Sequence, residues 1–127
     1  MAKKILIVDD DPDLLEAASI ILESKGYAVV KAYGGVEGLA KVRTERPDLI
    51  VLDVMMPDKD GYAVCKELKA DEKYRSIPIL LLTAVVANIP TSTYTQQMGM
   101  EMEADDYVDK PVEPEELAKR VAALLAK

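Results

Sequence analysis

Five polar residues with chemically useful side chains stand at the ends of short strand-like segments. They are Asp9 and Asp10 after residues 4–8, Asp53 after residues 49–52, Thr83 after residues 77–82, and Lys110 after residues 106–108. Carboxylates, a hydroxyl and an ammonium group can together bind a cation and stabilise a transferring phosphoryl group. The spacing therefore predicts phosphoryl chemistry, provided that folding brings these five side chains to one place.

The charges of this set predict a cation site. Asp9, Asp10 and Asp53 together carry −3 and Lys110 carries +1, which leaves −2. Two carboxylates about 4 Å apart repel each other by roughly 4 kcal/mol at an effective dielectric constant of 20. Such a cluster holds protons or binds a cation. A hard divalent ion, Mg²⁺ or Mn²⁺, suits carboxylate oxygens and leaves coordination positions open for a phosphate.

Asp53 is the candidate nucleophile of the set. With a cation bound, an ionised Asp53 can attack a phosphorus atom and become an acyl phosphate. Thr83 and Lys110 would then stabilise charge on the transferred oxygens. Taken singly, each residue has an ordinary explanation, as a loop acid, a strand-end threonine or a lysine with its ammonium group in solvent. Their recurrence at the ends of successive segments favours a shared site.

The segments that end in these residues have the pattern of buried strands. Residues 49–52 are an unbroken apolar run, typical of a strand buried on both faces of a parallel sheet. Strands expected at residues 4–8, 28–32, 48–53, 77–82 and 106–108 alternate with helical patterns that begin near Pro12, Val36, Gly61 and Pro114. This predicts an α/β fold, a doubly wound five-stranded parallel sheet of order 2-1-3-4-5 in a flavodoxin-like three-layer arrangement. That order brings the carboxyl ends of strands 1, 3, 4 and 5 together.

Local signals indicate how the chain turns between these elements. Asp11 is a suitable N-cap for a helix whose first position is Pro12. Pro57 cannot donate to a strand ladder and Gly61 tolerates a positive φ, so we expect the chain to leave the sheet after Asp53. In the helix that follows, Lys66 and Lys69 are expected to be exposed.

Composition narrows the function further. A chain of 127 residues is enough for one domain, and its net charge of −7 argues against gripping a nucleic-acid backbone. There is no apolar run near 18 residues, so we expect no membrane insertion and a cytoplasmic location. There is no histidine, which excludes histidine-dependent triads and means that any phosphohistidine must come from a partner. The single cysteine, Cys65, is expected to be a small buried hydrophobe.

Four motifs carry a family resemblance. They are IVDDD at the end of the first strand, LDVMMPDKDG around Asp53, LLTA ending at Ala84, and DDYVDKP at residues 105–111. By these motifs the whole chain resembles a receiver domain of bacterial two-component response regulators, of the single-domain, chemotaxis-receiver-like kind. The resemblance implies a (βα)5 receiver fold over residues 1–127, with no output domain in the chain.

The resemblance also implies a role for each residue of the site. Asp53 resembles the phosphoacceptor, and Thr83, Ala84 and Lys110 resemble the groups that bind the phosphoryl oxygens. Thr83 and Tyr107 resemble the pair that switches conformation. The implied magnesium ligands are Asp10, Asp53 and the backbone carbonyl of Met55, with Asp9 assisting directly or through water. For Tyr107, a tyrosine simply packed half-buried on its strand is the alternative.

The partners follow from the same resemblance. A sensor histidine kinase or a histidine phosphotransfer protein would supply the phosphoryl group, and a downstream target protein would receive the signal. The chain would not be an enzyme in the usual sense, because it would catalyse only its own aspartyl phosphorylation and dephosphorylation. Direct binding to nucleic acid is not expected.

One segment departs from the family pattern. The chain between Thr83 and Lys110 is several residues longer than usual, and Glu103 stands where the family usually has glycine. Residues 90–102 begin with a polar run and contain three methionines, which adapt their shape to a partner at little cost. Two hypotheses stay open, a surface that sets partner preference and a longer loop with no special role.

Three other functions fit the sequence less well. Aspartate-nucleophile phosphohydrolases commonly carry a second aspartate two residues after the nucleophile, and here that position is Met55, which cannot transfer protons. A flavodoxin-like nucleotide or flavin binder needs a phosphate loop, but the acids of residues 9–13 would repel phosphate. A receiver-like interaction module that is never phosphorylated would not need the acids, Thr83 and Lys110.

Overall fold

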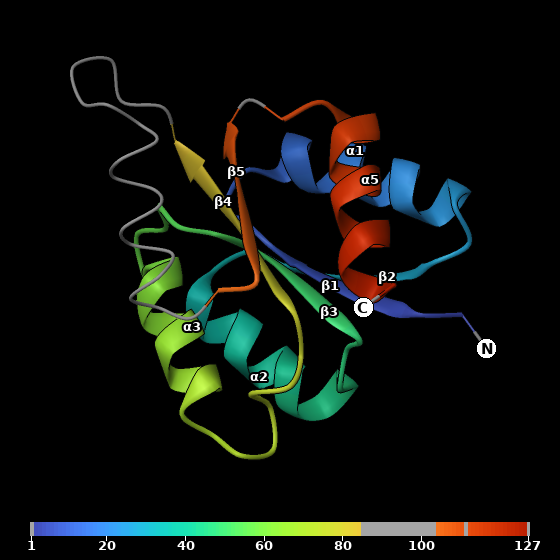
Figure 1. The fold of residues 1–127 in the computed structure, drawn as a ribbon. Coiled ribbons are helices and arrows are strands. Elements are labelled where there is room, and N and C mark those ends of the chain that lie inside the picture. The colour runs from blue at the N-terminus through green and yellow to red at the C-terminus, as the bar shows by residue number, and fades with distance from the viewer. Residues whose placement is uncertain (1, 85–103, 111, 127) are drawn as a thin grey trace.

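The computed structural model describes residues 2–84, 104–110 and 112–126, and Figure 1 shows its arrangement. The described residues form five strands and four helices. The elements are β1 (Lys4–Val8), α1 (Pro12–Ser24), β2 (Ala28–Ala32), α2 (Gly35–Glu45), β3 (Leu49–Asp53), α3 (Gly61–Lys69), β4 (Ile79–Ala84), β5 (Asp106–Lys110) and α5 (Pro114–Leu125). Residues 90–102 and Glu103, for which two hypotheses stay open, lie outside the described residues.

The strands form one parallel sheet of order β2-β1-β3-β4-β5. Helices α1 and α5 cover one face, and α2 and α3 cover the other (Figure 1). The predicted three-layer α/β fold and strand order are therefore confirmed. Three strands differ from the prediction at their ends. β3 begins at Leu49 rather than residue 48, β4 spans Ile79–Ala84 rather than residues 77–82, and β5 extends to Lys110 rather than residue 108.

Each face of the sheet has its own core. Alternate residues of β1, β3 and β4 pack against α1 and α5, and the residues between them pack against α2 and α3. The apolar residues 5–8, 49–52 and 79–82 of these strands are at most 1% exposed, as the apolar runs predict. Cys65 is fully buried in the α2 and α3 core, which confirms its expected place.

Caps and one close approach shape the loops at the carboxyl edge of the sheet. Asp11 caps α1, as predicted, by accepting a hydrogen bond from the backbone N–H of Asp13 at 3.0 Å. The chain leaves the sheet after Asp53, as expected, without a positive φ at Gly61; among the described glycines only Gly26 has one. Glycine is needed at position 61 because a Cβ atom there would collide with the backbone carbonyl oxygen of Asp53.

The expected exposure of Lys69 is wrong, whereas Lys66 is exposed as expected. The Lys69 side chain is 9% exposed, and its ammonium group donates to the carbonyl oxygens of Arg75 and Ile77, each at 3.0 Å. It also pairs with the Asp105 carboxylate at 2.9 Å. The turn after α3 folds back over this lysine, so its exposure depends on tertiary contacts rather than on helical periodicity.

None of the helices in the described part of the chain combines the length and the apolar content that crossing a bilayer requires.

Candidate functional site

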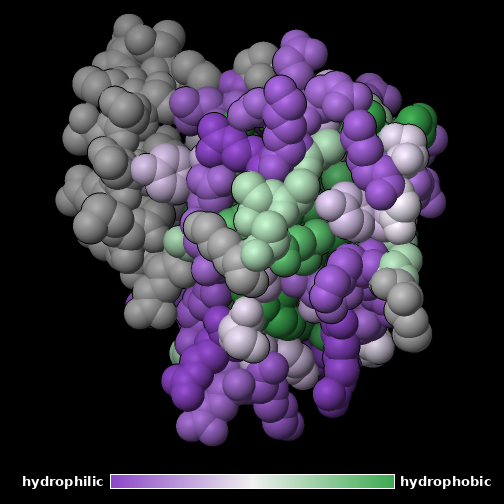
Figure 2. Space-filling view, turned by 45° about the vertical axis from the view of Figure 1, so that its right-hand side comes forward, coloured by the Kyte–Doolittle hydropathy of each residue, from purple (hydrophilic) through white to green (hydrophobic). Residues whose placement is uncertain are grey.

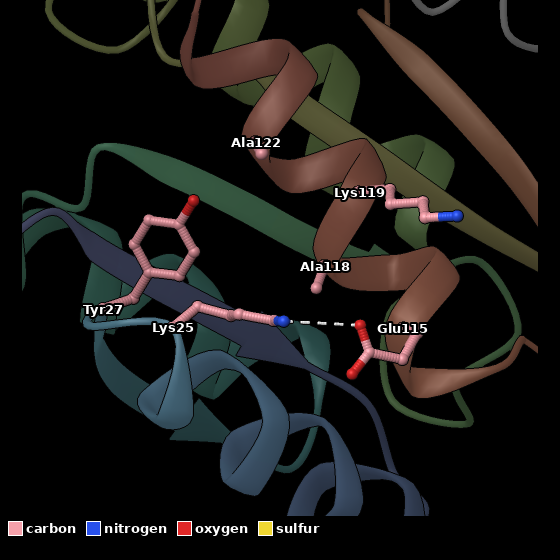
Figure 3. Close-up of a pocket in the computed structure, with 6 residues that line it drawn as sticks. All are labelled: Lys25, Tyr27, Glu115, Ala118, Lys119 and Ala122. Carbon is pink, nitrogen blue, oxygen red and sulfur yellow. Dashed lines mark ion pairs between the residues drawn. The ribbon is translucent and has the colours of Figure 1, made fainter.

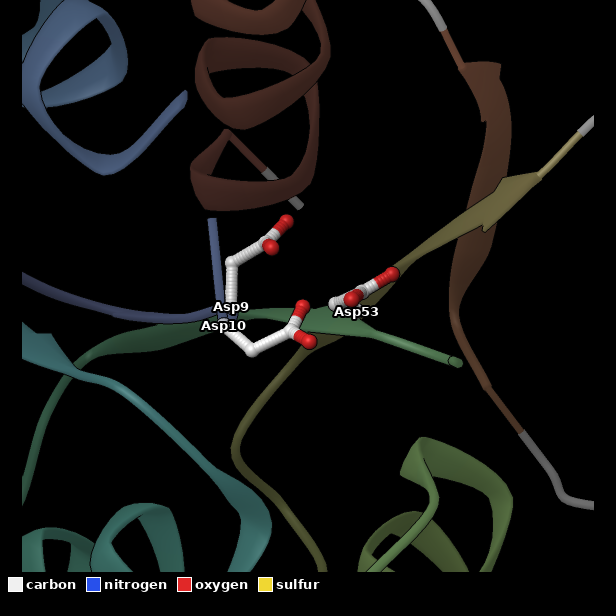
Figure 4. Close-up of side chains that lie close together, drawn as sticks. All are labelled: Asp9, Asp10 and Asp53. Carbon is white, nitrogen blue, oxygen red and sulfur yellow. The ribbon is translucent and has the colours of Figure 1, made fainter. Parts of the chain in front are cut away.

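Three aspartates form an acidic cluster at the carboxyl edge of the sheet. Figure 4 shows Asp9 and Asp10 directly after β1 and Asp53 at the end of the neighbouring strand β3. Each offers a carboxylate oxygen, and these oxygens lie within 4.8 Å of one another. Asp9 and Asp53 are buried, whereas Asp10 is exposed. The cluster is therefore open to solvent on the Asp10 side.

Lys110, at the end of β5, joins two of these acids. Its ammonium nitrogen lies 3.0 Å from Asp53 Oδ1 and 2.9 Å from Asp9 Oδ2. The contact between the Lys110 ammonium and Asp9 Oδ2 is an ion pair that does not meet the geometry of a hydrogen bond. The lysine reaches both acids because β1, β3, β4 and β5 all run parallel and end at the same edge.

Burial and neighbouring charges compete at Asp53. Burial raises the pKa of Asp53 to about 6; the hydrogen bond from Lys110 lowers it and the charge of Asp9 raises it. At Lys110, burial lowers the pKa, but contacts with Asp9 and Asp53 outweigh burial and hold it above its ordinary value. Burial therefore disfavours the ionised form of Asp53, and the neighbouring ammonium group of Lys110 favours it.

One oxygen of Asp53 has no partner to offset its burial. Asp53 Oδ2 is buried, and no donor among the described residues makes a hydrogen bond to it. Buried carboxylate oxygens are normally satisfied, so this oxygen indicates a ligand position. A hard divalent cation fits the donor set, because three carboxylates can offer it oxygens at once.

Met55 lies two residues beyond Asp53 and is 64% exposed. Its backbone N–H is directed at Asp53 Oδ1 over a long 3.4 Å. The side chain offers no acid or base next to the candidate nucleophile. The proposed role of the Met55 carbonyl as a metal ligand stays a prediction.

Thr83 is buried at the same edge of the sheet but turns toward β5. Its hydroxyl donates to Asp109 Oδ1 at 2.9 Å, with a second, longer approach to the Val108 carbonyl oxygen at 3.4 Å. The sequence alone did not single out Asp109. The parallel register, which places Thr83 opposite Asp109, is the signal that could have found it.

The remaining predicted site residues lie on the neighbouring strands. Tyr107 is partly buried and packs against the core on the α2 and α3 face, which agrees with the half-buried packing that the sequence also allowed. The backbone of Ala84 ends β4 opposite Lys110. The switch role of Tyr107 and the phosphate-binding role of Ala84 stay predictions.

A hollow lies away from the acidic cluster, between the end of α1 and α5. Its volume is about 310 Å³, and Figure 3 shows its lining residues, Lys25, Tyr27, Glu115, Ala118, Lys119 and Ala122. The Lys25 ammonium lies 3.4 Å from the Glu115 carboxylate. In Figure 2, the face that carries α1 and α5 shows hydrophobic surface near its middle, surrounded by hydrophilic side chains. None of the lining residues belongs to the acidic cluster.

Comparison with known proteins gives a consistent result. The sequence profile of the response regulator receiver domain matches residues 5–122. The alkaline phosphatase synthesis transcriptional regulatory protein PhoP of Bacillus subtilis is 45% identical over 125 residues, which are 98% of this chain and 49% of PhoP. The chain thus spans about half the length of the curated relatives it matches.

Solved structures agree with the fold. A putative response regulator from Chloroflexus aurantiacus matches with a TM-score of 0.89 and 37% identity, covering 100% of both chains. The signal receiver domain of a signal transduction histidine kinase from Syntrophus aciditrophicus matches with a TM-score of 0.87 and 38% identity, covering 98% of this chain and 91% of that one. The chain belongs to the response regulator receiver domain family of two-component signal transduction.

Proposed function

We propose that Asp53 is the phosphoacceptor of this receiver domain and takes its phosphoryl group from a phosphohistidine on a partner protein. The observation that carries the proposal is the state of the Asp53 carboxylate. One oxygen contacts the Lys110 ammonium at 3.0 Å, and the other is buried without a hydrogen bond from any described residue. A carboxylate oxygen without a hydrogen bond has its lone pairs free to contact a cation or to attack a phosphorus atom.

The transfer is a simple displacement. An Asp53 oxygen forms a bond to phosphorus while the bond from phosphorus to the partner's imidazole nitrogen breaks, and the imidazole leaves with that electron pair. The Lys110 ammonium stabilises charge on the phosphoryl oxygens. Because this chain has no histidine, the phosphohistidine would lie on a partner, a sensor histidine kinase or a histidine phosphotransfer protein.

The acidic cluster is the proposed site for Mg²⁺, or Mn²⁺. Asp9, Asp10 and Asp53 would hold the ion together with the backbone carbonyl of Met55. The bound ion would supply positive charge that offsets repulsion between the acids and the incoming phosphoryl oxygens. Asp10, the exposed member, would be its main anchor besides Asp53.

Thr83, Ala84 and Tyr107 are proposed to respond to phosphorylation. The Thr83 hydroxyl and the Ala84 backbone N–H would bind phosphoryl oxygens, and Tyr107 would repack as Thr83 moves. The protein would then act as a regulator in the cytoplasm and catalyse only its own phosphorylation and dephosphorylation. The exposed Met55 supports this over a phosphohydrolase, because no proton-transferring side chain stands at that position.

The output is proposed to be a downstream target protein. The relative from Bacillus subtilis is named a transcriptional regulatory protein, but this chain corresponds to only about half of it. The net charge of −7 supports contact with a protein rather than direct contact with nucleic acid.

Mass spectrometry of the intact protein tests the assignment of Asp53. After incubation with acetyl phosphate and Mg²⁺, the wild-type protein is expected to gain the mass of one phosphoryl group, and Asp53→Asn to gain none. Asp11→Asn is the matched control, because Asp11 is a neighbouring acid that caps α1 and asparagine caps equally well. Phosphorylation of Asp53→Asn would refute the assignment.

A further inference from the structure

The Thr83 hydroxyl is already engaged before any phosphoryl group is present. It donates to Asp109 Oδ1 at 2.9 Å, a contact made possible by the register that places the two residues opposite each other on β4 and β5. Thr83 is 2% exposed, so little water is available to compete for its proton. Hydrogen bonds from a hydroxyl to a carboxylate are stronger than those between neutral groups.

A hydroxyl has one proton to donate. While that proton lies on Asp109, the hydroxyl cannot donate to an oxygen elsewhere. The second acceptor, the Val108 carbonyl, also lies on the β5 side and is distant at 3.4 Å. Both contacts therefore hold the hydroxyl toward β5, and binding a phosphoryl group on Asp53 would require the bond to Asp109 to break.

Asp109 has no competing partner within the part of the chain that the structure describes. Its neighbour Lys110 pairs with Asp9 and Asp53 and makes no ion pair with Asp109. The carboxylate is exposed and is not part of the acidic cluster. Its hydrogen bond to Thr83 is thus a separate feature beside the phosphorylation site.

We propose that Asp109 is a positioning residue that holds the Thr83 hydroxyl away from the phosphoryl position in the unphosphorylated protein. The bond between Thr83 and Asp109 then opposes the phosphorylated conformation, and its strength sets how readily that conformation forms. The expected effect on phosphorylation rests on the proposed function of Asp53, whereas the contact between Thr83 and Asp109 does not.

The resting state can be tested without metal or phosphate. Three-bond couplings from the Thr83 methyl carbon to the backbone nitrogen and carbonyl carbon report the χ1 rotamer by NMR. We expect one rotamer in the wild-type protein and averaging over rotamers in Asp109→Ala. An unchanged, single rotamer in Asp109→Ala would overturn the proposal, whatever the outcome of phosphorylation experiments.

The consequence can be tested with beryllofluoride and Mg²⁺, a stable mimic of the phosphoryl group, by titration calorimetry. Asp109→Ala is expected to bind the mimic on the order of tenfold more tightly than wild type, as loss of one charge-assisted hydrogen bond predicts. Asp109→Asn, which keeps an acceptor but loses the charge, is expected to fall between them. Melting curves check that each variant is folded.

A double-mutant cycle separates the hydrogen bond from the charge. In a Thr83→Ala background, Asp109→Ala is expected to change the affinity less than twofold. Glu113→Gln is the matched charge control, since Glu113 is a nearby exposed acid whose side chain makes no capping bond, and it should change the affinity little. If Asp109→Ala raised the affinity equally with and without Thr83, Asp109 would act only by charge repulsion, and the proposal would be overturned. Failure of the wild-type protein to bind the mimic would overturn the proposed function instead.

Discussion

The carboxyl group of Asp53 is buried, and in the metal-free protein its ionisation is unfavourable. Its pKa is about 6 in the folded protein against an ordinary value of 3.8, with burial as the main cause. A raised carboxyl pKa means that the folded state loses stability as the pH rises from about 4 through 6, where the buried group must ionise. The property that suits Asp53 to bind a cation thus lowers the stability of the metal-free protein.

Asp53→Asn is therefore expected to stabilise the metal-free protein. At pH 7 the gain in unfolding free energy should be on the order of 2 kcal/mol, because the amide removes the cost of burying a charge. At pH 4 the gain should vanish, since the wild-type carboxyl is then protonated in the folded state. Urea unfolding at both pH values measures this. A gain that did not depend on pH would contradict the cause.

Lys110 offsets part of that cost. An ammonium group in solvent was the ordinary alternative for this residue, but in the structure the Lys110 side chain is 23% exposed and paired with two buried acids. Lys110→Ala is expected to lower the stability of the metal-free protein by about 2 kcal/mol at pH 7, because it leaves both acids without a counter-charge. Adding Mg²⁺ or adding the Asp53→Asn substitution should restore most of the loss. If Lys110→Ala lowered the stability equally in the wild-type and Asp53→Asn proteins, the lysine would act by packing alone.

Among the elements, the turn after α3 and the start of β4 depend on Lys69. Its ammonium contacts two carbonyl oxygens of the turn and the Asp105 carboxylate, and that carboxylate also accepts from the Ile79 backbone N–H at 2.8 Å. The pair thus fastens the end of α3 and the chain before β5 to the first residue of β4.

Lys69→Met is expected to destabilise the fold by about 3 kcal/mol, because it leaves polar groups of this network without their partner. Lys66→Met is the matched control on the same helix, since Lys66 is exposed, and it should change stability by less than about 0.5 kcal/mol. Chemical unfolding of both variants measures the difference. Similar effects at the two positions would contradict the role of Lys69.

Helix α2 is capped by a residue from another loop. Its N-cap, Gly34, has no side chain, and the Asp58 carboxylate accepts hydrogen bonds instead from the backbone N–H groups of Gly35 and Val36, each at 3.1 Å. The bonds from Val36 and Gly35 lower the pKa of Asp58. Because Asp58 lies in the loop that follows Asp53 and β3, this contact ties that loop to the start of α2.

Asp58→Ala is expected to speed hydrogen exchange at the Gly35 and Val36 amides several-fold. The lowered pKa gives the sign with pH: the carboxylate stabilises the fold above its ordinary pKa of 3.8, and the contribution is lost as the pH falls through the folded value. Asp60→Ala, which removes the cap of α3, should instead affect the Ala63 amide. Unchanged exchange at the start of α2 would contradict the contact.

At the scale of the whole molecule, the sheet separates two cores and gathers four strand ends at one edge. A ligand bound there contacts the ends of β1 and β3, two strands buried at the centre of the sheet. Binding is therefore expected to stabilise the domain as a unit, by RT ln(1 + [L]/Kd).

Mg²⁺ is expected to raise the melting temperature of the wild-type protein, with a gain in unfolding free energy of about 1.4 kcal/mol at tenfold the dissociation constant. Asp10→Ala should gain clearly less at the same concentration, because Asp10 is the exposed member of the cluster and the proposed anchor of the ion. Thermal unfolding with and without the ion measures both. An undiminished gain in Asp10→Ala would mean that the ion binds elsewhere.

The sequence alone determined the sheet and the residues at its edge. Unbroken apolar runs occur where both faces of a strand are buried, so residues 49–52 and 79–82 were recognisable without any contact information. Right-handed connections limit the possible strand orders, and because parallel strands end at the same edge of a sheet, Asp9, Asp53, Thr83 and Lys110 could be placed there.

Only the tertiary structure decided which side chains meet there. The pairing of Lys110 with Asp9, the Thr83 bond to Asp109, the burial of Lys69 and the capping of α2 by Asp58 each join residues from separate segments. Periodicity reports the environment of a residue along its own helix or strand, whereas these contacts depend on register and on where loops fold back. They are set by distances of a few ångströms between groups far apart in the chain, which no local pattern encodes.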